Sequence, residues 1–294
     1  MRSIMLSFIA SLFSSLSFIA ATTVGAEEKM KIVASFSILG DMVEQVVGEH
    51  ASITTIVGPD ADAHIYQPSI ADARSFADAD VIFVNGLGFE TWSKTLIAKS
   101  GTKGSVHVAT ENITPILIDG EVDPHAWNSL RNGIVYVTNI GTVLKKKMPE
   151  HAEAISANTT SYVEKLKALD VKTKASLAEL APDKRTVVTA HDAFGYLADA
   201  YSMNFLSPVG IDSEAVPSAK SLAKLIAQIK SDGAAALFME NISSPALIKQ
   251  ISDETGLEIG GRLFSDALSE RGGPATSYLA MFEHNLGTLI AALN

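Results

Sequence analysis

The sequence predicts an α/β protein of two lobes, each a mostly parallel sheet flanked by helices, joined by one long rigid helix. Three observations predict this fold. Short β-branched runs alternate with amphipathic helical runs, the alternation restarts near Thr186, and a helical stretch free of Gly and Pro separates the two halves. Strands separated by helices imply parallel pairing, because a parallel connection needs a crossover. A chain of 294 residues also exceeds what one compact core usually serves.

The first lobe is expected to span residues 27–149. Its short β-branched runs predict strands at Lys31–Phe36, Ser52–Val57, Val81–Asn85 and Ser105–Val108. Amphipathic stretches between them predict helices at Gly40–Val47, Ser69–Phe76 and Glu90–Lys99. The order therefore predicts a sheet with its helices as crossovers.

The second lobe is expected to span residues 182–294 and repeats this rhythm. Its predicted strands are Thr186–Thr189, Asn204–Pro208, Ala235–Met239 and Glu258–Phe264. Its predicted helices are Ala193–Tyr201, Ser218–Lys230, Pro245–Thr255 and Ser277–Leu293. A second α/β lobe follows from the pattern.

A long helix over 150–181 is expected to connect the two lobes, with a further helix at Asn132–Met148 before it. Pro149 and Pro182 bracket the connecting segment, which is rich in Ala, Lys, Glu and Leu. A helix of about 30 residues is about 45 Å long. Such a strut is stiffer than a hinge of two or three extended strands, so we expect only a small movement between the lobes.

The first 26 residues are typical of a secretory signal peptide. A single positive charge at Arg2 precedes an uncharged apolar run from Ile4 to Ala21, and small residues at Val24, Gly25 and Ala26 predict cleavage near Ala26. A membrane anchor is the alternative, but serines and threonines dilute the run. The chain contains no cysteine, which rules out lipid attachment through cysteine. We expect a soluble protein in the periplasm.

Composition narrows the classes of function. The chain has 23 Lys and Arg against 33 Asp and Glu, and its one basic cluster is Lys145–Lys147, so we expect no nucleic-acid partner. Without cysteine there are neither disulfides nor thiolate ligands. Any metal site must therefore use His, Asp or Glu.

Four residues with metal-ligand chemistry follow predicted strands. His64 comes after Ser52–Val57, and the other three are His125, His191 and Asp266. In open α/β sheets ligands bind beyond the carboxyl ends of strands, so we expect two of these residues from each lobe to meet in the cleft between the lobes. Three imidazoles and one carboxylate make a tetrahedral zinc shell. Spacing alone leaves two interpretations open, a shared metal site or unrelated loop residues.

Four segments resemble the signature segments of the zinc- and manganese-binding receptors of ABC importers. In order they are His64-x-Tyr66-x-Pro68, Asp123-Pro124-His125-x-Trp127, Ala190-His191-Asp192-Ala193-Phe194-x-Tyr196 and Ser265-Asp266. The resemblance covers essentially all of the chain after residue 26 and includes the long helix between the second and third segments. It implies that His64, His125, His191 and Asp266 bind one metal ion. It also implies a monomeric receptor that delivers the ion to a membrane permease with its ATPase.

The third ligand separates the members of this family. Zinc receptors have His there and manganese or iron receptors commonly have Glu, so His191 indicates Zn²⁺, with Mn²⁺ or Fe²⁺ as the alternative. Many zinc members also carry a His-rich loop between the first two ligand segments. From Leu87 to Pro124 this chain has only His107. Either a periplasmic metal chaperone delivers the zinc or the site acts alone, and the missing loop slightly favours the manganese alternative.

A zinc hydrolase is the competing class. It needs an open coordination position and a general base, for which Glu240 is the candidate. Four protein ligands leave no open position, so we expect no enzymatic activity. Glu240 is otherwise expected to support a ligand or to pair with Arg262. The remaining histidines, His50, His107, His151 and His284, are expected to have no role at the metal.

Four other side chains are expected to lie around the site. Asp62 and Asp192 are each expected either to accept an N–H from a ligand imidazole or to cap a following helix. Trp127 and Tyr66 are expected to pack beside the metal and exclude water. Three phenylalanines are expected in the core: Phe36, Phe83 and Phe238.

Overall fold

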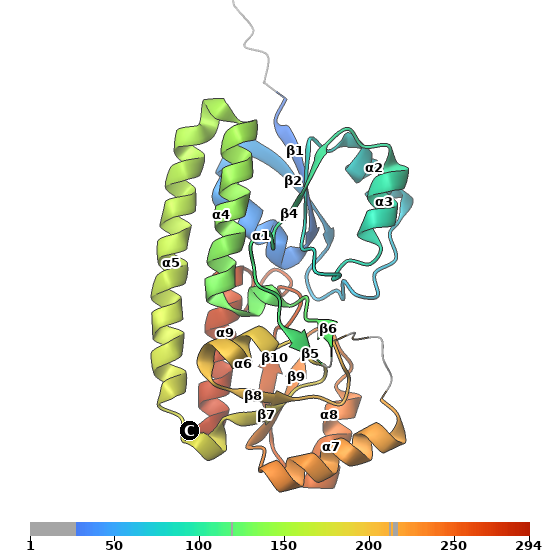
Figure 1. Cartoon of the computed structure of the whole chain (residues 1–294), viewed down its shortest axis with the longest axis vertical. Coiled ribbons are helices and arrows are strands. Elements are labelled where there is room, and N and C mark those ends of the chain that lie inside the picture. The colour runs from blue at the N-terminus through green and yellow to red at the C-terminus, as the bar shows by residue number, and fades with distance from the viewer. Residues whose placement is uncertain (1–27, 119, 212, 214–216) are drawn as a thin grey trace, which may run out of the picture.

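The structure is a computed structural model, and it describes residues 28–118, 120–211, 213 and 217–294. Two α/β lobes lie one above the other, and a long helix runs beside both (Figure 1). This confirms the predicted fold class. The expected signal peptide, residues 1–26, lies outside the described residues.

The first lobe is a four-stranded parallel sheet in the order β2-β1-β3-β4. Its strands are β1 (Met30–Phe36), β2 (Ala51–Val57), β3 (Val81–Val84) and β4 (Ser105–Val108). The central strands are buried on both faces, as continuous runs such as Val81–Val84 predict. The crossover helices are α1 (Ser37–Val47), α2 (Ile70–Asp78) and α3 (Ser93–Ser100).

The second lobe contains another four-stranded parallel sheet, in the order β10-β9-β7-β8. Its strands are β7 (Thr186–Val188), β8 (Asn204–Leu206), β9 (Ala236–Glu240) and β10 (Ile259–Leu263). Its helices are α6 (Gly195–Tyr201), α7 (Ala219–Asp232), α8 (Ala246–Thr255) and α9 (Tyr278–Leu293). Each sheet therefore turns its strand ends toward one edge, where loops can carry ligands.

Two antiparallel helices form the long side of the molecule, α4 (Leu130–Lys147) and α5 (Ala152–Ala178) (Figure 1). They approach closely where α4 has a glycine, since a Cβ on Gly141 would lie 2.4 Å from Oγ1 of Thr159. α5 has 27 residues, about 40 Å of helix. It packs against α1 in the first lobe and against α6 and α9 in the second, and so joins the lobes.

The ends of α5 differ slightly from expectation. A 3₁₀ turn at Pro149–His151 replaces the first residues of the predicted helix, α5 ends at Ala178, three residues before the predicted end, and a second 3₁₀ turn follows at Pro182–Lys184. Proline fixes its own φ and is tolerated in the first turn of a helix, which explains why each turn starts at a proline.

A small antiparallel hairpin was not predicted. It pairs β5 (Leu117–Ile118) with β6 (Glu121–Val122), and a 3₁₀ turn at Ala126–Asn128 follows it before α4. Two-residue strands are too short to show an alternating pattern in the sequence. The expectation that every candidate ligand follows a strand of the main sheets is therefore wrong for His125, which follows this hairpin.

The core matches the sequence-based expectation. Phe36, Phe83 and Phe238 are each at most 1% exposed. Across the described residues, no helix has both the length and the apolar character needed to cross a lipid bilayer.

Candidate metal centre

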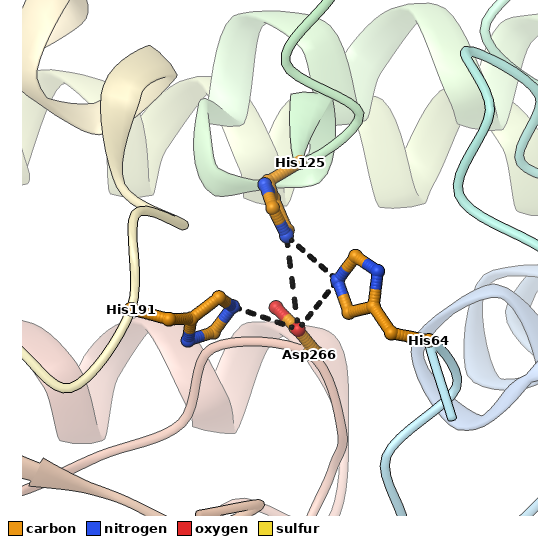
Figure 2. A group of neighbouring side chains, drawn as sticks. All are labelled: His64, His125, His191 and Asp266. Carbon is orange, nitrogen blue, oxygen red and sulfur yellow. Dashed lines mark hydrogen bonds and ion pairs between the residues drawn. The ribbon is translucent and has the colours of Figure 1, made fainter. Parts of the chain in front are cut away.

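The structure brings the four predicted ligand residues together. His64 lies in the loop after β2, His125 after β6, His191 after β7 and Asp266 after β10. Figure 2 shows the three imidazoles pointing at the Asp266 carboxylate. One ligand atom from each of the four lies within 4.8 Å of all the others, and no other such group was found among the described residues.

The distances between these atoms suit one small cation. Oδ2 of Asp266 lies 3.2 Å from Nε2 of His191, 3.3 Å from Nε2 of His64 and 3.7 Å from Nε2 of His125. The His64 and His125 Nε2 atoms are 3.1 Å apart. A tetrahedral ion with bonds of 2.0–2.1 Å holds its ligand atoms about 3.3 Å apart. Four of the six pairs of ligand atoms therefore lie close to the spacing of a tetrahedral shell, and all six lie within 4.8 Å.

Two of the three imidazoles have a carboxylate behind them. Nδ1 of His125 lies 2.8 Å from Oδ1 of Asp123, and Nδ1 of His191 lies 2.7 Å from Oε2 of Glu240. All four side chains are buried. A carboxylate at Nδ1 fixes the tautomer that leaves Nε2 free to bind a metal.

The backbone explains why these two carboxylates are so well placed. Oδ1 of Asp123 also accepts the amide of His125, and Oε1 of Glu240 accepts the amides of Ala190 and His191. Asp123 thus holds both the main chain and the ring of His125 by hydrogen bonds, whereas Glu240 holds the main chain at His191 by hydrogen bonds and its ring by a close ion pair. The expected supporting role of Glu240 agrees with this geometry, whereas no ion pair between Glu240 and Arg262 was found among the described residues.

The expectation for Asp62 is wrong in both its forms. Oδ1 of Asp62 accepts the backbone amide of His64 at 2.9 Å, and Oδ2 accepts the Ser213 hydroxyl at 2.6 Å. The carboxylate therefore holds the loop of His64 and links it to the second lobe. The short Asp62 side chain reaches the backbone amide of His64 more readily than it reaches the His64 imidazole.

The expected contact between Asp192 and the imidazole of His191 is also wrong. The two ring nitrogens of His191 face Glu240 and Asp266, which leaves neither for Asp192. Phe194 is the N-cap residue of α6, and that helix has no side-chain cap. The backbone amide of Asp192 donates to Gly210.

Aromatic rings enclose one side of the cluster. The Phe89 ring lies 4.7 Å from that of His64, and the Trp127 ring lies 5.4 Å from that of His125. Trp127 also donates from Nε1 to Ser265 O at 2.7 Å, so its predicted place beside the site is correct. Tyr66 instead packs on Trp92 and donates to Asp72. Phe89 was not predicted, because nothing in its local sequence distinguishes it from a core residue.

The buried histidines and carboxylates of the cluster stabilise each other's charged forms. Burial disfavours a charged His191, but the nearby Glu240 and Asp266 carboxylates outweigh burial and raise the pKa of His191 well above its usual value. Burial also opposes a charged Asp266, yet His125 and His191 lower the pKa of Asp266 well below its usual value. In the metal-free protein, a proton on His191 therefore compensates part of the negative charge that a metal ion would otherwise balance.

One oxygen of the cluster lacks a partner. Oδ1 of Asp266 is buried and has no hydrogen-bond partner among the described residues. A buried carboxylate oxygen without a partner is costly, and a cation would remove that cost. The orphaned atom thus fits a metal ion bound at this position.

The other four histidines lie elsewhere, as expected. His50 and His151 stack on each other with ring centroids 4.0 Å apart, His107 lies on β4, and His284 contacts the carbonyl of Arg262. None belongs to a group of potential ligands within the described part of the chain.

Comparison with known proteins gives a consistent class. The ZnuA family, described as zinc-uptake complex component A, periplasmic, matches residues 32–292. The manganese-binding lipoprotein MntA of Halalkalibacterium halodurans is 31% identical over 268 residues, covering 91% of this chain and 89% of MntA. The iron-binding protein YfeA of Yersinia pestis is 32% identical over 269 residues, covering 89% of this chain and 86% of YfeA.

Solved structures agree with these relatives. The periplasmic zinc-binding protein TroA of Treponema pallidum superposes with a TM-score of 0.86 at 27% identity, covering 90% of this chain and 99% of TroA. The manganese-bound periplasmic metal-binding protein of Candidatus Liberibacter asiaticus superposes with a TM-score of 0.83 at 30% identity, covering 90% of this chain and all of that one.

The fold and these relatives define the class of protein, a metal-binding receptor of an ABC transporter and not an enzyme. The chain belongs to the zinc-uptake complex component A family. The hydrolase considered from the sequence is thereby excluded. A receptor of this class works with a membrane permease and its ATPase.

Proposed function

We propose that this protein captures Zn²⁺ in the periplasm and delivers it to the permease of an ABC importer. The ion is the transported substrate, and its ligands are His64, His125, His191 and Asp266. One observation carries the proposal: these four residues bring Nε2 and carboxylate atoms within 4.8 Å of one another around one point, the donor set of a tetrahedral zinc shell.

The donor set favours zinc over harder ions. Three neutral nitrogens suit borderline Zn²⁺, and affinity at such sites generally rises from Mn²⁺ through Fe²⁺ to the later metals. Carboxylates at Nδ1 of His125 and His191 make these rings more basic ligands. A nitrogen-rich site with strengthened imidazoles is therefore expected to bind zinc more tightly than manganese.

Mn²⁺ or Fe²⁺ is the second candidate, and three observations favour it. Relatives at 31–32% identity are named manganese- and iron-binding proteins. The free Oδ1 of Asp266 also gives the site a second oxygen, and oxygen ligands suit Mn²⁺. The one histidine between Leu87 and Pro124, His107, lies on β4 and leaves the site without a His-rich loop.

The organisation of the chain forms part of the proposal. We place a cleaved signal peptide at 1–26, the lobes at 27–149 and 182–294, and the connecting segment at 150–181. The mature protein is then a periplasmic monomer, which takes zinc directly or from a chaperone. Parallel sheets of the described residues at 30–108 and 186–263 support these lobe limits.

Metal content and competition binding test the proposal. The purified mature chain is dialysed against equimolar Zn²⁺, Mn²⁺ and Fe²⁺, and bound metal is measured. We expect one Zn²⁺ per chain, with loss of binding in His64→Ala and retention in the control His107→Ala. Retention of Mn²⁺ or Fe²⁺ in place of zinc would refute the zinc assignment, and equal binding by both variants would refute the site.

A further inference from the structure

Asp60 has a left-handed backbone conformation, which Asp and Asn adopt more often than other residues with a Cβ. Its φ is 51°, in the left-handed region, and it lies exposed in the loop between β2 and His64. A residue with a Cβ pays about 1–2 kcal/mol in this conformation. Such a conformation persists where surrounding contacts hold it. The contacts of Asp60 therefore indicate its structural role.

Every described contact of Asp60 crosses from the first lobe to the second. Its amide donates to Leu268 O at 2.8 Å. Its Oδ1 accepts from Nδ2 of Asn241 at 2.9 Å, and its Oδ2 accepts from the amide of Glu270 at 3.1 Å. The left-handed turn thus aims the amide and both carboxylate oxygens at two loops of the second lobe, the loop after β9 with Asn241 and the loop after β10 with Leu268 and Glu270.

The loop after β10 carries the proposed metal ligand Asp266. Nδ2 of Asn241, held by Asp60, also donates to Ala267 O at 3.2 Å, directly after Asp266. On the other side of Asp266, Trp127 donates to Ser265 O at 2.7 Å. Ser37 accepts the amide of Leu268 at 2.9 Å. The loop after β10 is therefore fastened to the first lobe on both sides of the ligand.

We propose that Asp60 is a positioning residue for Asp266: its contacts with Leu268, Asn241 and Glu270 hold the ligand loop across the lobe boundary. The inference rests on the proposed function, because it assigns Asp60 a role at the same metal. Asp60 touches none of the four ligands and acts through the loop alone. Metal ligands tolerate little displacement, so loosening this loop weakens the site without removing a ligand.

Asp60→Gly is the direct test. Glycine keeps the left-handed backbone and the amide bond to Leu268 and removes both carboxylate acceptors. The matched control is Asn112→Gly, because Asn112 is exposed in the first lobe with a φ of 67°. Asp60→Asn is the conservative variant, which keeps one acceptor oxygen and tolerates the left-handed region.

We expect Asp60→Gly, which loses two solvent-exposed hydrogen bonds, to bind Zn²⁺ about tenfold more weakly than the native chain. The zinc affinity of Asp60→Asn is expected to lie between those of Asp60→Gly and the native chain, and the zinc affinity of Asn112→Gly is expected to equal that of the native chain. Because Asp60 is exposed, the melting temperature of the metal-free protein should change little. The visible spectrum of bound Co²⁺, which depends on coordination geometry, should change in Asp60→Gly.

Two results would overturn the inference. One is native zinc affinity and a native Co²⁺ spectrum in Asp60→Gly. The other is weaker binding with an unchanged Co²⁺ spectrum and an equal loss of stability without metal, which indicates a merely structural role. The Asp266→Ala variant tests the proposed function separately. If that variant retained zinc, the proposed metal site would be wrong, whatever the result for Asp60→Gly.

Discussion

Nδ1 of His191 lies 2.7 Å from Oε2 of Glu240, and both side chains are buried. The pair determines which nitrogen of His191 faces the metal position. With Nδ1 paired to the Glu240 carboxylate, Nε2 is the nitrogen that faces Asp266 and the proposed metal position. Glu240 is therefore expected to control zinc affinity without touching the ion.

Glu240→Gln tests this relationship. The amide oxygen can still accept from the Ala190 and His191 amides, but its NH₂ group then faces Nδ1 and moves the ring proton to Nε2. We expect zinc affinity to fall by about 10–100-fold. Titration of zinc by calorimetry measures this, with Glu258→Gln, an exposed residue of the same lobe, as control. Unchanged affinity would show that Glu240 does not orient His191.

Asp266→Ala should weaken zinc binding more than loss of any one supporting carboxylate. Asp266 supplies the only negative charge among the four ligands, and breaking a buried charge pair costs about 3–5 kcal/mol. That corresponds to at least about a hundredfold in Kd. Competition with a fluorescent zinc chelator measures the loss, and Asp253→Ala on α8 serves as the control. A change below tenfold would mean that water or Glu240 replaces the missing oxygen.

His191→Glu should move the metal preference. The variant has two nitrogens and two carboxylates, so it should bind Mn²⁺ more tightly and Zn²⁺ less tightly than the native chain. Because Glu240 would then face a second carboxylate, His191→Glu combined with Glu240→Gln should show the larger shift. Calorimetric titration with both metals gives the ratio. An unchanged ratio would show that position 191 does not select the metal.

Zinc affinity should fall as the pH falls. An imidazole must be neutral to bind, and the pKa of His191 is raised above the usual value of about 6.5. Protons therefore compete with zinc from above neutral pH, and the loss should continue down to about pH 5. Chelator competition at several pH values measures it. A constant Kd between pH 8 and pH 5 would argue that histidines are not the ligands.

The metal-free protein should show the opposite trend in stability. A raised folded-state pKa at His191 contributes stability that is complete below about pH 6.5 and is lost as the pH rises through that raised value. The lowered pKa of Asp266 contributes above about pH 3.9 and is lost only in stronger acid. The rise in melting temperature on adding zinc should therefore grow between pH 6 and pH 8.

Zinc should stabilise the protein without a large change in shape. A thousandfold excess of zinc over Kd adds about 4 kcal/mol to the free energy of unfolding. α5 packs against helices of both lobes, so the lobes have little freedom to close. Small-angle scattering with and without zinc should give nearly equal radii of gyration. Marked compaction would contradict the rigid connection.

The local sequence pattern was enough to predict most of the secondary structure of this protein. Alternating β-branched and amphipathic runs gave the eight strands of the two main sheets, because strand and helix periods depend on neighbouring residues alone. His64, His191 and Asp266 follow strands of the main sheets as predicted, His125 does not, and the resemblance of four segments linked the four residues. Prolines at 149 and 182 bounded the long helix, whose ends shifted by a few residues.

Contacts between distant segments decided the rest. Glu240 supports His191 from 49 residues away, and Asp60 meets Glu270 from 210 residues away. The local sequence around these residues does not reveal either pairing, because both pairings depend on how the two sheets and their loops pack. Even Asp123, two residues from His125, was not predicted as its partner. The sequence by itself determined the fold class and the candidate ligands; the tertiary structure alone decided what holds each of them in place.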